Sequence, residues 1–202
     1  QAAAITIPKG YKEFFARWQA TLMALGATYK LAQAQGRIAI GLGNESVQET
    51  AISLHRTYGV PYLPGSALKG LAARFAAKRL GDAWNRDSEA DRIVFGDTTQ
   101  AGYLTFFDAY PDPASGPLLL HPDIMAIHHP DYYQGQDAAP ADWDDPILVP
   151  FPTATGSYLV ALAGPLAEWA QPWVERTFAI LGQALEEVGI GAKTSSGYGR
   201  MT

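Results

Sequence analysis

The segment that most limits the fold is the glycine-rich stretch 189–202, which directly follows a long amphipathic pattern over 166–188. Glycine lets a backbone turn through positive φ and come close to a ligand, and N–H groups in such turns bind oxyanions. Two cations add charge for phosphate, and a tyrosine adds a flat face for a base or sugar. The segment therefore predicts contact with a phosphate backbone. The candidate residues are Gly191, Lys193, Thr194, Ser195, Ser196, Gly197, Tyr198, Gly199 and Arg200.

Two familiar nucleotide-binding signatures are excluded by local context. A P-loop requires G-x-x-x-x-G-K-[ST] between a strand and a helix. Lys193 and Thr194 are present, but Glu187 and Ala192 stand where the glycines belong. A dinucleotide fingerprint requires G-x-G-x-x-G at the start of a helix, and Thr194 replaces its last glycine. The sequence therefore argues against a P-loop ATPase and against a dehydrogenase.

The charge balance limits which partners the chain can bind. Its 20 acidic and 15 basic residues give a net charge of −5 at pH 7, whereas a protein that binds nucleic acid alone is usually basic. Basic residues concentrate in 55–80 and 193–200, and acidic residues in 82–97 and 108–145. We therefore expect one basic face on an acidic body that meets protein neighbours.

Cysteine and long apolar runs are both missing from the sequence. The absence of cysteine excludes disulfides and thiolate metal sites and fits a cytoplasmic protein. No run approaches the roughly 18 apolar residues of a membrane span, and no signal peptide is recognised. Gln1 is not an initiator Met, so the completeness of the N-terminus stays open.

Hydrophobic periodicity predicts an α+β fold. Helical spacing of apolar residues predicts helices over 9–35, 67–80 and 166–188. Ser66 is the expected N-cap of the second helix. Alternation and β-type composition predict strands over 37–42, 51–58 and 102–109, with one or two more within 147–163.

The remaining segments read as loops, and the order of elements narrows the topology. Residues 82–92 are polar, and 111–146 form a loop-rich insertion without a clear period. Strands in this order cannot all be parallel. A split βαβ, or ferredoxin-like (RRM-like), sheet fits best. We expect one domain over 1–202, with an N-terminal helical extension over 1–36.

Four motifs in order resemble those of the RAMP superfamily, the ferredoxin-like RNA-binding subunits of type III CRISPR effector complexes. They are P-G-S-x-x-K-G over 64–70, F-G at 95–96, and the glycine-rich 191–200. The fourth, D-x-M-x-x-H-x-P-x-Y-Y over 123–133, is similar to a stretch in the sixth RAMP subunits of Cmr, or type III-B, complexes. The resemblance covers about 61–200.

The resemblance implies a non-catalytic, RNA-binding structural subunit of a ribonucleoprotein for antiviral defence. It would cap the guide-RNA filament near the guide 3′ end and contribute to target-RNA binding. Its partners would be guide (CRISPR) RNA, target RNA and other RAMP subunits, with no membrane, metal or cofactor. A phosphate would sit at the positive end of the 67–80 helix, held by Gly65, Ser66, Lys69 and Arg74.

The insertion carries side chains that suit stacking or metal binding. His121, Asp123 and Asp131, with two adjacent histidines, are types that ligate zinc or manganese. Adjacent histidines point apart in extended chain, however. We therefore favour stacking on RNA bases or on a neighbouring subunit, by His128, His129, Tyr132 and Tyr133.

An enzyme and a pure adaptor are the alternatives. His55 and Arg56, expected on a strand, would allow a metal-independent endoribonuclease that processes guide RNA with His55 or His128 as general acid or base. The sequence places no second acid–base group, so we prefer a half-buried histidine beside a phosphate-binding arginine. A protein adaptor without an RNA role is supported only by the net acidity.

Overall fold

The structure is a computed structural model of the whole chain. It describes residues 7–43, 51–116, 120–129, 132, 135, 139, 141, 145–166 and 168–202. Tyr133, Pro130 and Asp131, which belong to the predicted stacking and metal-type groups or their motif, lie outside these described residues. No helix in the described ranges is both long and apolar enough to cross a membrane.

The described chain contains both helices and strands. They are α1 (Tyr11–Ala24), β1 (Thr28–Gln33), α2 (Gly65–Arg79), η1 (Asp82–Trp84), α3 (Glu89–Phe95), β2 (Thr105–Phe106), β3 (Tyr110–Pro111), η2 (Pro113–Ser115), β4 (Leu120–Ile127), β5 (Ile147–Ala154), β6 (Ser157–Ala163), η3 (Glu168–Ala170), α5 (Gln171–Glu187) and η4 (Thr194–Ser196). Both helices and antiparallel sheets are present, which confirms the α+β class.

A four-stranded sheet is built around β6. β1 pairs antiparallel with one edge of β6, and β2 and β3 pair antiparallel with the other. Because β1 and β2 both run opposite to β6, they run in the same direction, with α2 between them in the chain. The segment after α5 returns to the outer edge of β1, where Gln33 and Thr202 exchange backbone hydrogen bonds of 2.6 and 2.9 Å.

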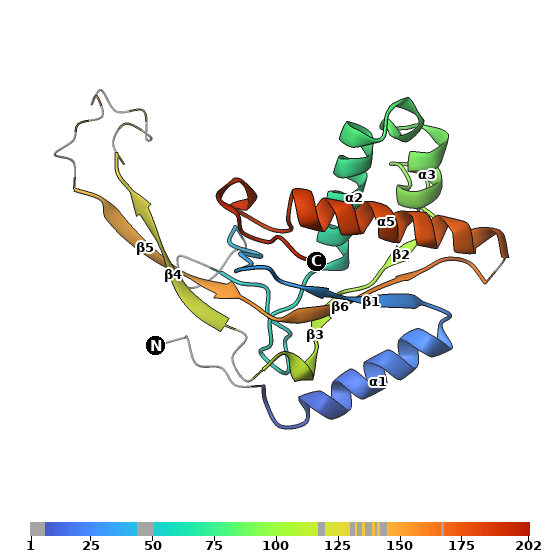
Figure 1. Cartoon of the computed structure of the whole chain (residues 1–202), viewed down its shortest axis with the longest axis horizontal. Coiled ribbons are helices and arrows are strands. Elements are labelled where there is room, and N and C mark those ends of the chain that lie inside the picture. The colour runs from blue at the N-terminus through green and yellow to red at the C-terminus, as the bar shows by residue number, and fades with distance from the viewer. Residues whose placement is uncertain are drawn as a thin grey trace.

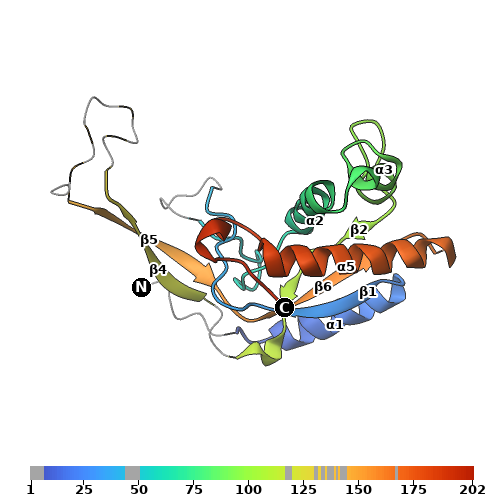
Figure 2. The ribbon, with the colours of Figure 1, turned by 45° about the horizontal axis from the view of Figure 1, so that its top comes forward.

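Helices cover both faces of this sheet (Figures 1 and 2). The larger core lies under α2 and α5 and includes Leu68, Leu162 and Leu181. The smaller core lies under α1, where Tyr11 and Phe15 pack with Leu159 of β6. β6 is buried from its second residue onward, which explains why its sequence is a continuous apolar run rather than an alternating one.

A second, two-stranded sheet forms an arm that projects from the body (Figure 1). β4 and β5 pair antiparallel from Leu120 opposite Ala154 to Ile127 opposite Ile147. At the base of the arm Ile38 and Ala154 exchange two backbone hydrogen bonds of 2.8 Å. We use "the arm" below for β4 and β5.

The long N-terminal helix expected over 9–35 is wrong beyond Ala24. Gly26 adopts φ +69°, a left-handed conformation that ends a helical path. The chain then forms β1, whose Tyr29 and Leu31 also fit a period of two. The segment fits both the helical period and the period of two, and pairing with β6 selects the strand. The residues of β6 lie far along the chain, so the local sequence does not reveal this pairing.

Other segment predictions also need correction. Residues 82–92 are not a plain loop, because Ser88 caps α3 by accepting a hydrogen bond from the Asp91 N–H. The described part of 111–146 contains the strand β4. In contrast, 37–42 and 51–58 form only isolated bridges, and the strand over 102–109 shrinks to β2.

Candidate functional site

The glycine-rich segment after α5 packs tightly against the chain that follows β1. The Ile190 N–H donates to the Gly199 carbonyl (2.9 Å), and the Gly199 N–H donates to the Arg37 carbonyl (2.8 Å). A Cβ on Gly199 would lie 1.9 Å from the Ile190 oxygen, and one on Gly191 would lie 2.3 Å from the Ala39 oxygen. These two glycines therefore permit close backbone packing within the protein. Gly199 is buried and its N–H is already bonded, so it is not the free phosphate donor that we expected.

Asp123 of β4 joins the arm to this segment. Its Oδ2 accepts a hydrogen bond from the Tyr198 hydroxyl (2.8 Å) and lies 3.2 Å from Nη1 of Arg37. Arg37 also donates from Nη1 to the Pro122 carbonyl (2.5 Å). One carboxylate thus connects the arm, the segment after β1 and the glycine-rich loop. Asp123 is therefore held by an ion pair and a hydrogen bond.

These contacts shift the acidity of both partners. Partial burial alone would raise the pKa of the Asp123 carboxyl, but the Tyr198 hydrogen bond, the Ile124 N–H and the Arg37 charge outweigh it and lower that pKa. The bond to Asp123 raises the pKa of the Tyr198 hydroxyl. The carboxylate is therefore the acceptor at neutral pH, and Tyr198 is its donor.

The Lys193 side chain packs against the arm and does not extend into solvent. Its backbone is left-handed, with φ +57°, and its Nζ lies 2.8 Å from the Met125 sulfur. The same Nζ lies 5.7 Å from the centre of the Phe151 ring. Phe151 in turn packs against Tyr198 at 6.0 Å between ring centres. Lys193 and Tyr198 are thus held by the arm, so the free aromatic face expected of Tyr198 is partly used internally.

The outer surface of the loop stays open. Gly191, Ser195, Ser196, Gly197 and Arg200 are exposed, and Thr194 is half-buried. In the described ranges Arg200 makes no ion pair. Arg37 pairs with Asp123, and Lys193 contacts Met125 on the same strand, so two cations meet one carboxylate here among the described side chains. The neighbourhood is therefore locally positive on a protein whose net charge is −5.

The start of α2 differs from the expected phosphate site. Ser66 is not the N-cap, because α2 begins at Gly65 and Pro64 precedes it without a side-chain cap. The Gly65 N–H donates to Asp108 Oδ1 (2.8 Å), so a carboxylate of the protein occupies the position predicted for a phosphate. Ser66 and Arg74 are exposed and Lys69 is half-buried. No hydrogen bond or ion pair joins this helix start to the glycine-rich loop within the described chain.

His55 lies in a tight turn and not on a strand. Its Nδ1 accepts the backbone N–H groups of Thr57 (3.2 Å) and Tyr58 (3.3 Å). Its ring packs against Phe14, Tyr58 and Tyr110 at 5.0 to 5.3 Å between ring centres. One ring nitrogen is therefore occupied and the ring is held among aromatic side chains, which does not favour proton transfer to RNA. Arg56 beside it is exposed.

The histidines at the end of β4 are also placed. His128 and His129 have ring centres 6.3 Å apart and tilted planes. His128 and Tyr132 are exposed, and His129 is half-buried. Among the residues whose positions are described, no three His, Cys, Asp or Glu side chains gather in a way that could hold a metal ion. His121 instead hydrogen-bonds to the Thr155 hydroxyl at 3.0 Å.

We expect Tyr198→Phe to raise the pKa of Asp123 towards its ordinary value, because it removes the largest contribution that lowers it. A lowered folded-state pKa means that the contact stabilises the protein above a pH of about 4 and is lost as the pH falls through the folded pKa. Carboxyl-carbon NMR titration measures the change. Tyr103→Phe, at an exposed tyrosine on another part of the molecule, is the matched control. An unchanged Asp123 pKa in Tyr198→Phe would contradict the assignment.

Comparison with known proteins gives consistent matches. The family model of the RAMP superfamily matches residues 32–202. The CRISPR system Cmr subunit Cmr6 of Pyrococcus furiosus is 30% identical over 249 residues, which cover 95% of this chain and 72% of that protein. The crystal structure of Cmr6 from Pyrococcus furiosus matches with a TM-score of 0.55 and 32% identity, over 87% of this chain and 97% of that one.

One chain of a larger assembly has a similar fold. A chain in the cryo-EM structure of the Type III-B Cmr-beta bound to cognate target RNA matches with a TM-score of 0.70 and 21% identity. The match covers 96% of this chain but 64% of that chain, so this chain spans just under two thirds of its length.

Proposed function

This chain belongs to the RAMP superfamily and is homologous to Cmr6 subunits of type III-B CRISPR complexes, and on that basis we propose that it is a non-catalytic RNA-binding structural subunit of such a ribonucleoprotein. It would cap the guide-RNA filament near the guide 3′ end and contribute to target-RNA binding. One structural match is a chain of an assembly bound to target RNA, which supports this assignment.

The observation that carries the proposal is the locally positive surface where the glycine-rich loop meets the arm. Arg37 and Tyr198 both bind Asp123, which fixes the arm to the loop in one geometry. The exposed hydroxyls of Ser195 and Ser196 and the exposed Arg200 then face solvent beside it. Hydroxyl, guanidinium and backbone N–H groups are the usual ligands of RNA phosphates. A fixed loop would bind a phosphate backbone with little loss of conformational entropy.

Helices cover both faces of the sheet, so we favour RNA contact at the glycine-rich loop over RNA contact at a sheet face. An RRM stacks bases on aromatic side chains of an open sheet face. Here α2 and α5 cover one face and α1 packs its Tyr11 and Phe15 on the other. We interpret the sheet as a ferredoxin-like unit, since β6 lies between β1 and β2 and α2 connects β1 to β2 in the chain. The sheet face that is open in an RRM is covered here.

The proposal assigns no catalytic role. The His55 nitrogen Nδ1 already accepts two backbone N–H groups, and the ring is packed among Phe14, Tyr58 and Tyr110. This geometry gives no support to the endoribonuclease alternative. Incubating the purified protein with repeat RNA in EDTA tests the point, and RNA products with 2′,3′-cyclic phosphate ends that vanish in His55→Ala would overturn it.

Charge reversal at Arg200 tests the RNA surface. In Arg200→Glu we expect RNA affinity to fall by about tenfold and the salt slope to fall by about one, because one phosphate contact is lost. Arg17→Glu on α1, also exposed, makes the same change in net charge away from the loop and should leave both unchanged. The measurement is binding to a single-stranded RNA of about 40 nucleotides at about 50 and 200 mM salt, with and without the other subunits.

The possible binding results distinguish an RNA-binding subunit from non-specific charge effects and from a pure protein adaptor. Weak, salt-sensitive binding by the isolated protein that tightens with partner subunits supports a shared RNA filament. Equal loss of RNA binding in Arg200→Glu and Arg17→Glu would show that net charge, and not this loop, controls the affinity. Full complex assembly without any RNA contribution from the loop would favour a pure adaptor.

A further inference from the structure

An exposed apolar patch lies at the end of the body opposite the arm. Three segments that are distant in the sequence meet there: the end of α1, the connection between β6 and α5, and the residues just before β2 (Figures 1 and 2). We use "the end patch" for their five large exposed side chains. The exposed fractions are 61% for Met23, 49% for Leu25, 54% for Tyr103, 89% for Leu166 and 51% for Trp169.

Two contacts connect the three segments. The ring of Trp169 lies edge-on to that of Tyr103, with ring centres 5.5 Å apart and an angle of 89° between the planes. Leu166 packs directly over Gly26, where a Cβ would lie 2.8 Å from Leu166 Cδ2. The connection between β6 and α5 therefore touches both of the other segments. The two aromatic rings support each other and present a rigid surface.

Charged residues are nearly absent from the segments that form the end patch. Residues 18–29, 98–104 and 164–170 contain a single one, Glu168, although 17% of the whole chain is charged. The core of a protein–protein interface shows the same depletion of charge, together with enrichment in Tyr, Trp and Met. The composition therefore indicates a protein interface and not an ordinary solvated end of the molecule.

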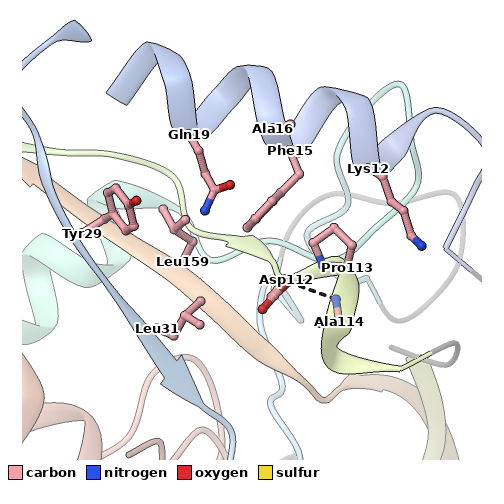
Figure 3. A pocket seen from close by; sticks show the side chains of 10 residues that line it. All are labelled: Lys12, Phe15, Ala16, Gln19, Tyr29, Leu31, Asp112, Pro113, Ala114 and Leu159. Atoms are coloured by element: carbon pink, nitrogen blue, oxygen red, sulfur yellow. Dashed lines mark hydrogen bonds between the residues drawn. The ribbon is translucent and has the colours of Figure 1, made fainter. Parts of the chain in front are cut away.

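A pocket farther back along α1 shows the contrast. It has a volume of about 460 Å³, lies between α1, β1 and η2, and includes the charged Lys12 and Asp112 among its lining residues (Figure 3). That surface mixes charged and apolar groups. The end patch instead offers a partner apolar side chains and one carboxylate.

Area and charge together select the occupant of the end patch. Its side chains expose roughly 600 Å², the upper end for the largest patch on a monomer and about three quarters of the area that each partner buries in a standard interface. Glu168 is exposed between Leu166 and Trp169 in the chain. A symmetric pair of copies would bring two Glu168 carboxylates together and join two bodies of charge −5, which disfavours association. RNA would bring its phosphates to the same carboxylate, whereas single-stranded RNA sites combine aromatic rings with a positive groove.

We propose that the end patch docks against an apolar surface of a neighbouring protein subunit, one that places a lysine or arginine opposite Glu168. Leu166 and Trp169 are the central anchors of this contact, because large, well-packed side chains carry most of the energy of an interface. The glycine-rich loop lies on the arm side of the body (Figure 1), so RNA and this subunit can be bound together. The proposal rests on the proposed function, since the neighbour is another subunit of the same complex.

A cation at position 166 tests the contact without disturbing the fold. Because Leu166 is 89% exposed, Leu166→Lys should keep the wild-type Tm. It turns an ammonium group towards a basic partner surface, so we expect the affinity for the remaining subunits to fall by about tenfold or more. Leu166→Met keeps an apolar side chain of similar volume and should keep wild-type affinity.

Charge reversal at Glu168 tests the chemistry of the partner. Glu168→Lys replaces the attraction to the partner's cation by repulsion, so we expect it to weaken assembly as Leu166→Lys does. Glu13→Lys, exposed at the other end of α1, makes the same change in net charge away from the end patch. It should assemble with wild-type affinity.

Hydroxyl-radical oxidation of side chains gives a second readout on the full-length protein. Tyr103 and Trp169 should be oxidised readily in the isolated protein and protected in the complex. Trp84, which is 8% exposed, should be protected in both and serves as the internal control. Single-stranded RNA alone should leave the oxidation of Tyr103 and Trp169 unchanged.

Each result decides the proposal. Equal affinity of Leu166→Lys and Leu166→Met for the other subunits, or equal oxidation of Trp169 with and without them, overturns it. Protection already present in the isolated protein overturns it too, since the chain itself or a second copy would then cover the end patch. Protection by RNA alone would assign the patch to RNA. A wild-type protein that joins no complex overturns the proposed function, and the docking proposal with it.

Discussion

Gly199→Ala should lower the free energy of unfolding by at least about 3 kcal/mol, the upper range for single substitutions. Gly199 has φ +77°, and a Cβ there would lie 1.9 Å from the Ile190 oxygen. Left-handed backbone costs an alanine about 1–2 kcal/mol. The overlap adds to this, because the loop must move away and weaken the hydrogen bonds to Ile190 and Arg37.

Gly197→Ala is the matched control for this loss. Gly197 also has a positive φ, of +90°, but a Cβ there would meet nothing within 4 Å. Only the backbone strain remains, so the loss should be about 1–2 kcal/mol. Urea unfolding of the two variants and the wild type measures the difference. Equal losses would mean that the close approach of Gly199 to Ile190 does not restrict the loop.

Gly65→Ala is expected to cost about 3 kcal/mol, from overpacking and from a weakened hydrogen bond to a charged acceptor. A Cβ on Gly65 would lie 2.2 Å from the Phe106 carbonyl oxygen and 3.0 Å from the Phe107 carbonyl carbon. The start of α2 would have to move from β2, and the Gly65 N–H would leave Asp108. Thermal unfolding should show a fall in Tm of about 2–4 °C per kcal/mol for a domain of this size.

Gly70→Ala, one turn further along α2, should have the opposite sign. A Cβ on Gly70 meets nothing within 4 Å, and alanine in a helix interior is favoured over glycine by about 1 kcal/mol. The two glycines of one motif would then be separated by their physical roles. If Gly65→Ala kept wild-type stability and lost only RNA binding, Gly65 would belong to a phosphate site after all.

Helices with one buried face could be predicted from the sequence, and edges of the sheet could not. The spacing of Leu68, Phe75, Phe178 and Leu181 places α2 and α5 within a few residues of their observed bounds. For α1 the same spacing runs on through Leu25 to Tyr29, and the helical period conceals the turn at Gly26. Strand β1 is specified by pairing with β6, which no local window of sequence contains.

The candidate site was found in part. The glycine-rich loop and its cations are local in sequence, so their composition alone marked them. The contact that fixes the loop joins Arg37, Asp123 and Tyr198, which come from three distant segments. Arg37 was missed, because a single arginine before a short apolar run carries no signal. The RNA-contacting roles of the exposed loop residues, of Ser66, Lys69 and Arg74, and of His128, His129 and Tyr132 stay predictions.

The place of β1 in the sheet has a consequence for how the protein is made. Gln33 pairs with Ser157 on one side and with Thr202 on the other, and α1 packs on Leu159. Synthesis proceeds from the N-terminus, so α1 and β1 leave the ribosome with none of these partners yet made. Their apolar side chains therefore remain without these partners during most of translation. Such distant pairings slow folding, and the N-terminal part of the chain cannot act as its starting point.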